Sequence, residues 1–168
     1  MNMKKSRLIV SIVFLVLTLI TTITIIVNSF IRENVSAAMS QGLSNAVEDT
    51  FKPETTSTET FATIVRKSIG HFLLNGLNAG FATLALFFYG KDKFNHRGVL
   101  LPIGLFYGVL ISGLSEFIQL FVEGRGGTWK DVGINSLGCL FFVFIIGLVY
   151  SIKFVIVSRK TKQKENVH

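Results

Sequence analysis

Residues 115–138 read SEFIQLFVEGRGGTWKDVGINSLG, a stretch that sets charged and polar residues between two apolar runs. Glu116 lies inside the first run, a Gly-rich turn follows over residues 123–130, and Asp131 opens the second run. A carboxylate at the centre of a membrane-spanning helix costs roughly 2.5 to 3.5 kcal/mol on insertion scales. Glu116 therefore needs either a partner within the protein or a function that justifies its place.

The composition of the whole chain indicates a membrane protein. Of its 168 residues, 49% are hydrophobic and only 16% are charged, which is too apolar for an ordinary water-soluble domain. Four segments approach the roughly 20 apolar residues that a bilayer span needs; they are residues 8–31, 69–89, 99–122 and 134–157. We therefore expect an all-α polytopic membrane protein, a four-helix transmembrane bundle.

These runs divide the chain into four parts. We expect a first transmembrane helix at 1–31, an extracytoplasmic linker at 32–68, a three-helix transmembrane core at 69–157 and a basic cytoplasmic tail at 158–168. A cleaved signal peptide is the alternative for the first part, but its apolar run exceeds the usual ~7 to 15 residues. Within the linker, residues 34–51 could form a weakly amphipathic surface helix and residues 52–60 a polar tether.

Charge at the ends of the apolar runs predicts the orientation. One side is rich in basic residues within short distances of the spans, namely Lys4, Lys5, Arg7, Lys91, Lys93, Arg97, Lys153, Arg159, Lys160, Lys162 and Lys164. The positive-inside rule places this side, with both termini, in the cytoplasm and the turn at 123–130 outside. Because these positive charges flank apolar runs, the net charge of +7 indicates a membrane surface rather than nucleic acid.

The second apolar run carries a polar stripe. Lys67, His71, Asn75 and Asn78 follow at helical spacings, so we expect them on one face that descends into the membrane. A hydrogen-bonded structural histidine is the alternative to a functional one. On the neighbouring face, Gly76 and Gly80 form a GxxxG pair that allows close approach of another helix; we expect a helix contact there.

The third run repeats this arrangement and ends in the carboxylate. Gly104, Gly108, Ser112 and Glu116 stand four residues apart, so a ridge of small residues leads to Glu116 on the helix-packing side. Gln119 follows on nearly the same face. We therefore expect Glu116 to face other helices rather than lipid.

The turn and the fourth run add further polar residues at the same end. Thr128 and Asp131 have the spacing of a capping box, and Asn135 lies one helical turn deeper. Arg125 lies among glycines before the start of this helix, a setting that can receive an anion. Because neighbouring spans alternate in direction, these residues and His71, Asn75, Glu116 and Gln119 should meet at the outer leaflet.

Other chemistry has little support in the sequence. The single cysteine, Cys139, lies in an apolar run, so a disulfide or thiolate metal site within one chain is excluded and a packing role is expected. The GxxxxGK[ST] pattern of a nucleotide loop does not occur. We expect no metal and no cofactor, and the sequence shows no activated Ser or Cys nucleophile.

Several of these motifs together resemble the VanZ-like family of small bacterial membrane proteins. The resemblance rests on Lys67-x-x-x-His71-Phe72, SEFIQLF at 115–121, Arg125, and Asp131-x-x-x-Asn135-x-x-Gly138, and it covers residues 67 to about 147. It implies a helical protein of the cytoplasmic membrane, and the founding member is associated with low-level teicoplanin resistance. The family often has Tyr one turn after the His, where this chain has Asn75.

Three hypotheses for function follow. The leading one is binding of an anionic lipid-linked cell-wall intermediate or a lipidated glycopeptide at the outer leaflet, with membrane lipids as further partners and no nucleic acid. Its candidate ligand-binding residues are Lys67, His71, Asn75, Glu116, Gln119, Arg125, Asp131 and Asn135. The second is a membrane-embedded enzyme with His71 and Glu116 as the acid–base pair, and the third is a polar cluster that only locks helices together.

Overall fold

The structure, a computed structural model, describes residues 3–31, 58–90 and 97–165, and all regular secondary structure in these ranges is helical. Its elements are α1 (Met3–Phe30), α4 (Thr58–Tyr89), the short 3₁₀ helix η2 (Arg97–Val99), α5 (Leu100–Gln119) and α6 (Trp129–Glu165). Each long helix contains a stretch long and apolar enough to cross a membrane, and these are Lys4–Phe30, Ser68–Tyr89, Leu100–Gln119 and Trp129–Ile156. The predicted all-α, four-span architecture is confirmed.

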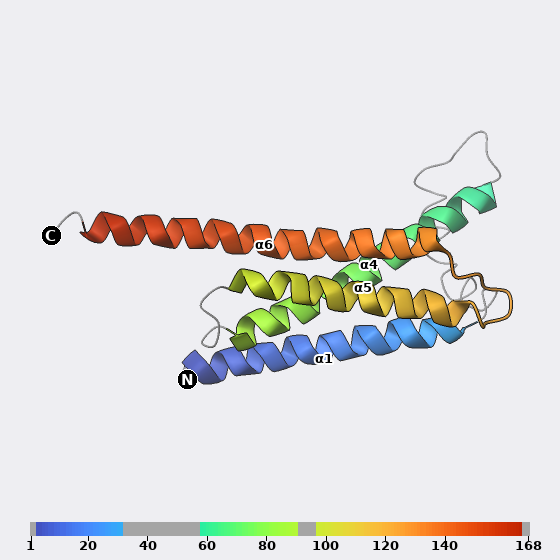
Figure 1. Cartoon of the computed structure of the whole chain (residues 1–168), viewed down its shortest axis with the longest axis horizontal. Helices are drawn as coiled ribbons and strands as arrows, with labels where there is room; N and C mark the ends of the chain where they lie inside the picture. The colour runs from blue at the N-terminus through green and yellow to red at the C-terminus, as the bar shows by residue number, and fades with distance from the viewer. Residues whose placement is uncertain (1–2, 32–57, 91–96, 166–168) are drawn as a thin grey trace.

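The four long helices pack side by side (Figure 1). α4 contacts each of the other three long helices, and α5 completes the centre of the bundle by packing against both α4 and α6. The described ends of the chain, in α1 and α6, lie at one end of the bundle, and the α5–α6 turn lies at the other. This arrangement matches the predicted alternation of spans, while the side of the membrane that each end faces stays a prediction.

Helices α4 and α6 extend beyond the apolar runs of the sequence. α4 begins at Thr58, well before the apolar run at residue 69, and α6 continues to Glu165 through most of the expected tail. Neither extension contains Gly or Pro, so a helix nucleated by the membrane span continues at little cost. The last residues of the expected tether at 52–60 are therefore helical, whereas the expected surface helix at 34–51 lies outside the described residues.

Glycines set the contact between the antiparallel helices α4 and α5. A Cβ on Gly104 would overlap Thr83 Oγ1, and a Cβ on Gly108 would lie 2.5 Å from the Cβ of Ala79. Gly104 thus pairs with Thr83, and Gly108, four residues later on α5, pairs with Ala79, four residues earlier on α4. The predicted ridge is confirmed, because Gly104, Gly108, Ser112 and Glu116 are all buried.

Helices α4 and α6 run in the same direction, and residues four apart on α4 contact residues four apart on α6. Asn135 contacts His71, Cys139 contacts Asn75, and Val143 packs with Ala79. The core of α4, α5 and α6 therefore consists of layers, each with one residue from each helix. We call them the polar layer (His71, Glu116, Asn135), the second layer (Asn75, Ser112, Cys139) and the third layer (Ala79, Gly108, Val143).

Helix α1 joins this core through a separate set of polar contacts. Asn78 Nδ2 donates to Thr18 O, to Thr21 Oγ1 at 2.8 Å and to Thr22 Oγ1 at 2.7 Å. Thr22 Oγ1 also lies 2.7 Å from the hydroxyl of Tyr107 on α5. Asn78 therefore contacts α1, whereas His71 and Asn75 from the same predicted stripe contact Asn135 on α6.

Candidate functional site

The polar layer is held by amide groups whose orientation can be deduced. Asn75 Nδ2 lies 3.0 Å from the backbone O of His71, which can only accept a hydrogen bond. The same Nδ2 donates to Asn135 Oδ1 at 3.0 Å, and this contact orients the amide of Asn135. Asn135 Nδ2 is then directed at Glu116 Oε1, to which it donates at 3.1 Å.

This orientation also determines the tautomer of His71. Its Nδ1 lies 3.1 Å from Asn135 Oδ1 and 3.5 Å from Glu116 Oε1, and both atoms are acceptors. His71 Nδ1 must therefore carry a proton, and in the neutral ring the basic nitrogen is Nε2. A carboxylate that holds an imidazole in one tautomer is also found in acid–base catalysis.

Glu116 lies at the centre of the site. Its Oε1 accepts hydrogen bonds from Asn135 Nδ2 and, at 3.3 Å, from Gln119 Nε2 on the same helix. The side chain of Glu116 is 4% exposed, whereas that of His71 is 16% exposed. His71 is therefore the more accessible member of the central pair, and Glu116 is the more deeply buried one.

The second layer contains polar atoms without partners. The register between α4 and α5 puts Ser112 opposite Asn75, and both residues are almost fully buried. Among the described residues, neither Asn75 Oδ1 nor Ser112 Oγ has a hydrogen-bond partner. Because buried polar groups are normally satisfied, these two atoms are the points of the core where a further hydrogen-bond partner is expected.

The third layer ends the polar region of the core. Ala79, Gly108 and Val143 have no polar side-chain atom, and Cys139, next to them, donates its thiol to Asn75 O at 3.4 Å. The predicted packing role of Cys139 is thus confirmed. Apart from Thr83, whose hydroxyl donates to Ala79 O beyond this layer, the polar groups that the three helices share lie toward the end that carries the α5–α6 turn.

The structure brings five of the predicted site residues together and gives separate contacts to others. The five are His71, Asn75, Glu116, Gln119 and Asn135. Arg125 donates from Nη1 to Asn28 O at 2.9 Å, which places a cation at the C-terminal end of α1, where the helix dipole favours it. The side chain of Lys67 lies outside the described residues.

Asp131 has the capping position that its spacing predicts. Its backbone N–H donates to Thr128 Oγ1 at 3.1 Å, so Thr128 is the N-cap of α6. Its side chain is buried in the first turn. Within residues 3–31, 58–90 and 97–165, His71, Glu116 and Asp131 do not form a three-residue group that could hold a metal ion.

Comparison with known families agrees with this architecture. The family model described as VanZ/LLP1 matches residues 8–150. The chain belongs to the VanZ/LLP1 family. A search of curated proteins and a search of solved structures found no match.

The VanZ/LLP1 match is wider than the resemblance seen in the motifs. It includes the first span, which the motif comparison left out, and so most of the chain shares the family pattern. In the structure, α1 of this VanZ/LLP1 chain contributes contacts to Asn78 and Tyr107. The spacing of Thr18, Thr21 and Thr22 is the sequence signal that turns them toward other helices, because residues at i, i+3 and i+4 share one helix face.

Proposed function

We propose that this VanZ/LLP1 protein binds the anionic head group of a lipid-linked or lipidated ligand in the outer leaflet of the cytoplasmic membrane. On this proposal it contributes to teicoplanin resistance or to envelope homeostasis. The observation that carries the proposal is the buried carboxylate of Glu116 with its donors, behind a more exposed His71 at one end of the core. The hydrogen-bonded network gathers at one end of the core and the third layer beyond it is apolar, which favours binding from one leaflet over passage across the membrane.

The energetics favour a ligand-directed role over helix locking alone. Interhelical hydrogen bonds in membranes average about 0.6 kcal/mol, so the contacts of Glu116 with Asn135 and His71 supply about 1.2 kcal/mol. Burying the carboxylate costs roughly 2.5 kcal/mol or more. Each of these contacts therefore offsets only a fraction of that cost, and a hydrogen-bonding group of a bound ligand would add to the stabilisation of Glu116.

The charges around the site suit an anionic lipid with polar substituents. Arg125 and Lys130 lie in and beside the turn at this end, and Lys130 is exposed. These cations would meet a phosphate, while His71 and the second layer would bind hydroxyl or amide groups of the head group. Trp129 is 90% exposed, which suits a side chain anchored at the membrane interface.

The first test replaces Glu116 with glutamine, which keeps the shape of the side chain and removes its charge. We expect roughly a tenfold loss of anionic lipid that co-purifies with the protein, equivalent to about 1.4 kcal/mol, together with reduced teicoplanin resistance in a sensitive bacterial host. Lipid mass spectrometry on gently extracted protein measures the first effect. Glu123→Gln is the matched control, because Glu123 is exposed in the turn.

Two results would contradict the proposal. One is unchanged lipid retention and resistance in Glu116→Gln at normal protein levels. The other is a loss of lipid that only follows a parallel loss of thermal stability, which would favour the helix-locking role.

An acid–base enzyme is the second candidate, and the tautomer of His71 favours it. With Nδ1 directed at Asn135 and Glu116, Nε2 is the basic nitrogen of the neutral ring and would be the one to transfer a proton. The same lipid extracts distinguish the two candidates. A modified lipid that appears with the wild-type chain and disappears in His71→Gln would indicate catalysis.

A further inference from the structure

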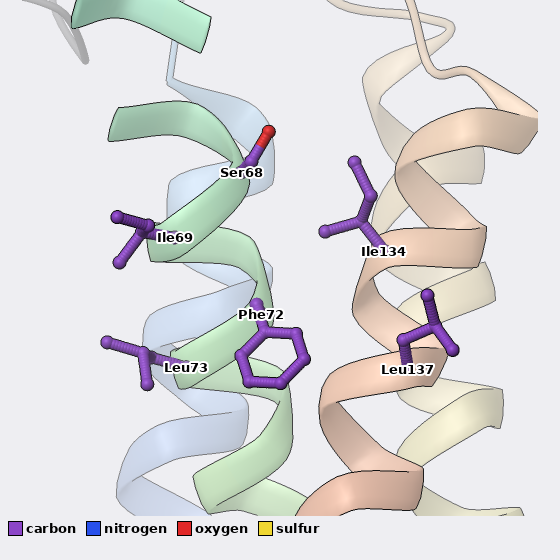
Figure 2. Close-up of a pocket in the computed structure, with 6 residues that line it drawn as sticks. All are labelled: Ser68, Ile69, Phe72, Leu73, Ile134 and Leu137. Carbon is purple, nitrogen blue, oxygen red and sulfur yellow. The ribbon is translucent and has the colours of Figure 1, made fainter. Parts of the chain in front are cut away.

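A groove between α4 and α6 lies directly beside the polar layer. It has a volume of about 410 Å³ and is lined by Ser68, Ile69, Phe72, Leu73, Ile134 and Leu137. In Figure 2 the ring of Phe72 and the side chain of Ile134 project into the space between the two helices. Apart from Ser68, the lining is apolar, and both helices are membrane spans. The groove therefore faces the hydrocarbon of the bilayer.

The groove has a closed end, set by glycines. A Cβ on Gly138 would overlap the backbone O of Phe72, and a Cβ on Gly76 would lie 2.5 Å from Phe142 Cδ2. The two helices thus touch below Leu137, which confirms the contact predicted for the Gly76–Gly80 pair. Beside this contact, the larger side chains of Phe72 and Ile134 line the groove.

The lining residues alternate with residues of the polar layer and the second layer. His71 lies immediately before Phe72 on α4, and Asn135 lies immediately after Ile134 on α6. A molecule in the groove is thus next to the helix faces that carry the hydrogen-bonded network. Lys130 is exposed and shares a stripe with Ile134 and Leu137 at i, i+4 and i+7, which puts a cation above the groove.

From this arrangement we propose that the groove binds the hydrocarbon chain of an anionic phospholipid that enters sideways from the bilayer. The inference rests on the proposed function and deepens it, because it names the ligand class and the route of entry. The chain segment next to the head group lies between Phe72 and Ile134, the phosphate faces Lys130, and the hydroxyl groups approach His71. From Ser68 to Leu73 the groove extends about 7.5 Å along α4, so it holds only this segment of the chain.

The test uses the full-length protein in nanodiscs that contain phosphatidylglycerol with a photoreactive diazirine near the ester end of one chain. After irradiation, mass spectrometry of peptides should place most adducts on residues 68–73 and 134–137. Unlabelled phosphatidylglycerol should compete, and phosphatidylcholine should compete at least tenfold less well. Adducts spread evenly over the exposed faces of α1 and α6, or equal competition by both lipids, would overturn the proposal.

A second, independent experiment fills the groove with a larger side chain and measures the yield of lipid adducts. Leu137→Trp should reduce these adducts at least tenfold, whereas Leu140→Trp, at an exposed position of α6 outside the groove lining, should leave them unchanged. Adduct yields that are equal in the two variants would contradict the proposal. The wild-type adduct map stands even if a variant fails to fold. Displacement by teicoplanin but not by phosphatidylglycerol would also overturn the proposal, since it would assign the groove to a lipidated antibiotic.

The groove and the proposed head-group function can fail separately. If Glu116→Gln loses anionic lipid while wild-type adducts lie elsewhere, the head-group site survives and the groove assignment is wrong. If adducts map to the groove but Glu116→Gln retains both lipid and resistance, the groove holds a lipid and the function assigned to the polar layer is wrong.

Discussion

Replacing Asn135 with leucine is expected to lower the melting temperature of the purified protein on the order of 10 °C. Asn135 is fully buried and links all three helices, since it donates to Glu116 and accepts from His71 and Asn75. Leucine leaves the carboxylate and two N–H donors without this partner. A buried donor or acceptor left without a partner costs about 1 to 3 kcal/mol, and more when it is charged, and each kcal/mol corresponds to roughly 2 to 4 °C in a chain of this size.

Ser136→Ala is the matched control for this variant. Ser136 is the next residue of α6 and is only half-buried, so its loss should change the melting temperature little. Heating in detergent, followed by size-exclusion chromatography, measures the folded fraction of both variants. A melting temperature for Asn135→Leu that equals that of the wild type would contradict the hydrogen-bond network described for the polar layer.

Gly138→Ala is expected to have the second largest effect, although it adds only a methyl group. The new Cβ would overlap the carbonyl O of Phe72 and lie 2.9 Å from its carbonyl carbon. Backbone atoms inside a helix cannot rotate away, so α4 and α6 must separate. Overpacking of this kind costs typically about 1 to 3 kcal/mol, which the same heating assay detects.

Gly133→Ala tests whether this effect comes from contact or from the helix itself. A Cβ on Gly133 would meet no atom within 4 Å, and alanine is the better helix former by up to about 1 kcal/mol. Gly133→Ala should therefore match or exceed the wild-type stability. Similar losses in both variants would argue against the close contact between α4 and α6.

Much of the fold follows from periodicity that the sequence displays. Apolar length predicted the four spans, and the four-residue spacing of Gly104, Gly108 and Glu116 predicted which face of α5 is buried. The Thr128–Asp131 spacing predicted the cap of α6. These signals are local, because each depends on residues within one helix and on the known geometry of a turn.

The features that sequence reasoning missed depend on the pairing between helices. Whether Asn78 faces α6 or α1 is decided by the rotation of α4 against its neighbours, which close contacts at Gly76 and Gly138 determine. The contact between Glu116 on α5 and His71 on α4 also depends on how these two helices pack. The contact of Arg125 with Asn28 joins residues far apart in the chain, and one sequence carries no signal for it.

Orientation decides whether the polar layer faces the ligand that we propose, and thiol labelling in intact cells tests it most directly. In a Cys139→Ala background, cysteine is introduced at Gly126 or at Gly98, which are exposed at opposite ends of the bundle and have no atom within 4 Å of an added Cβ. We expect a membrane-impermeant maleimide to label Gly126→Cys in intact cells and Gly98→Cys only after lysis. The reverse pattern would put the polar layer in the cytoplasmic leaflet and contradict the proposed binding site in the outer leaflet.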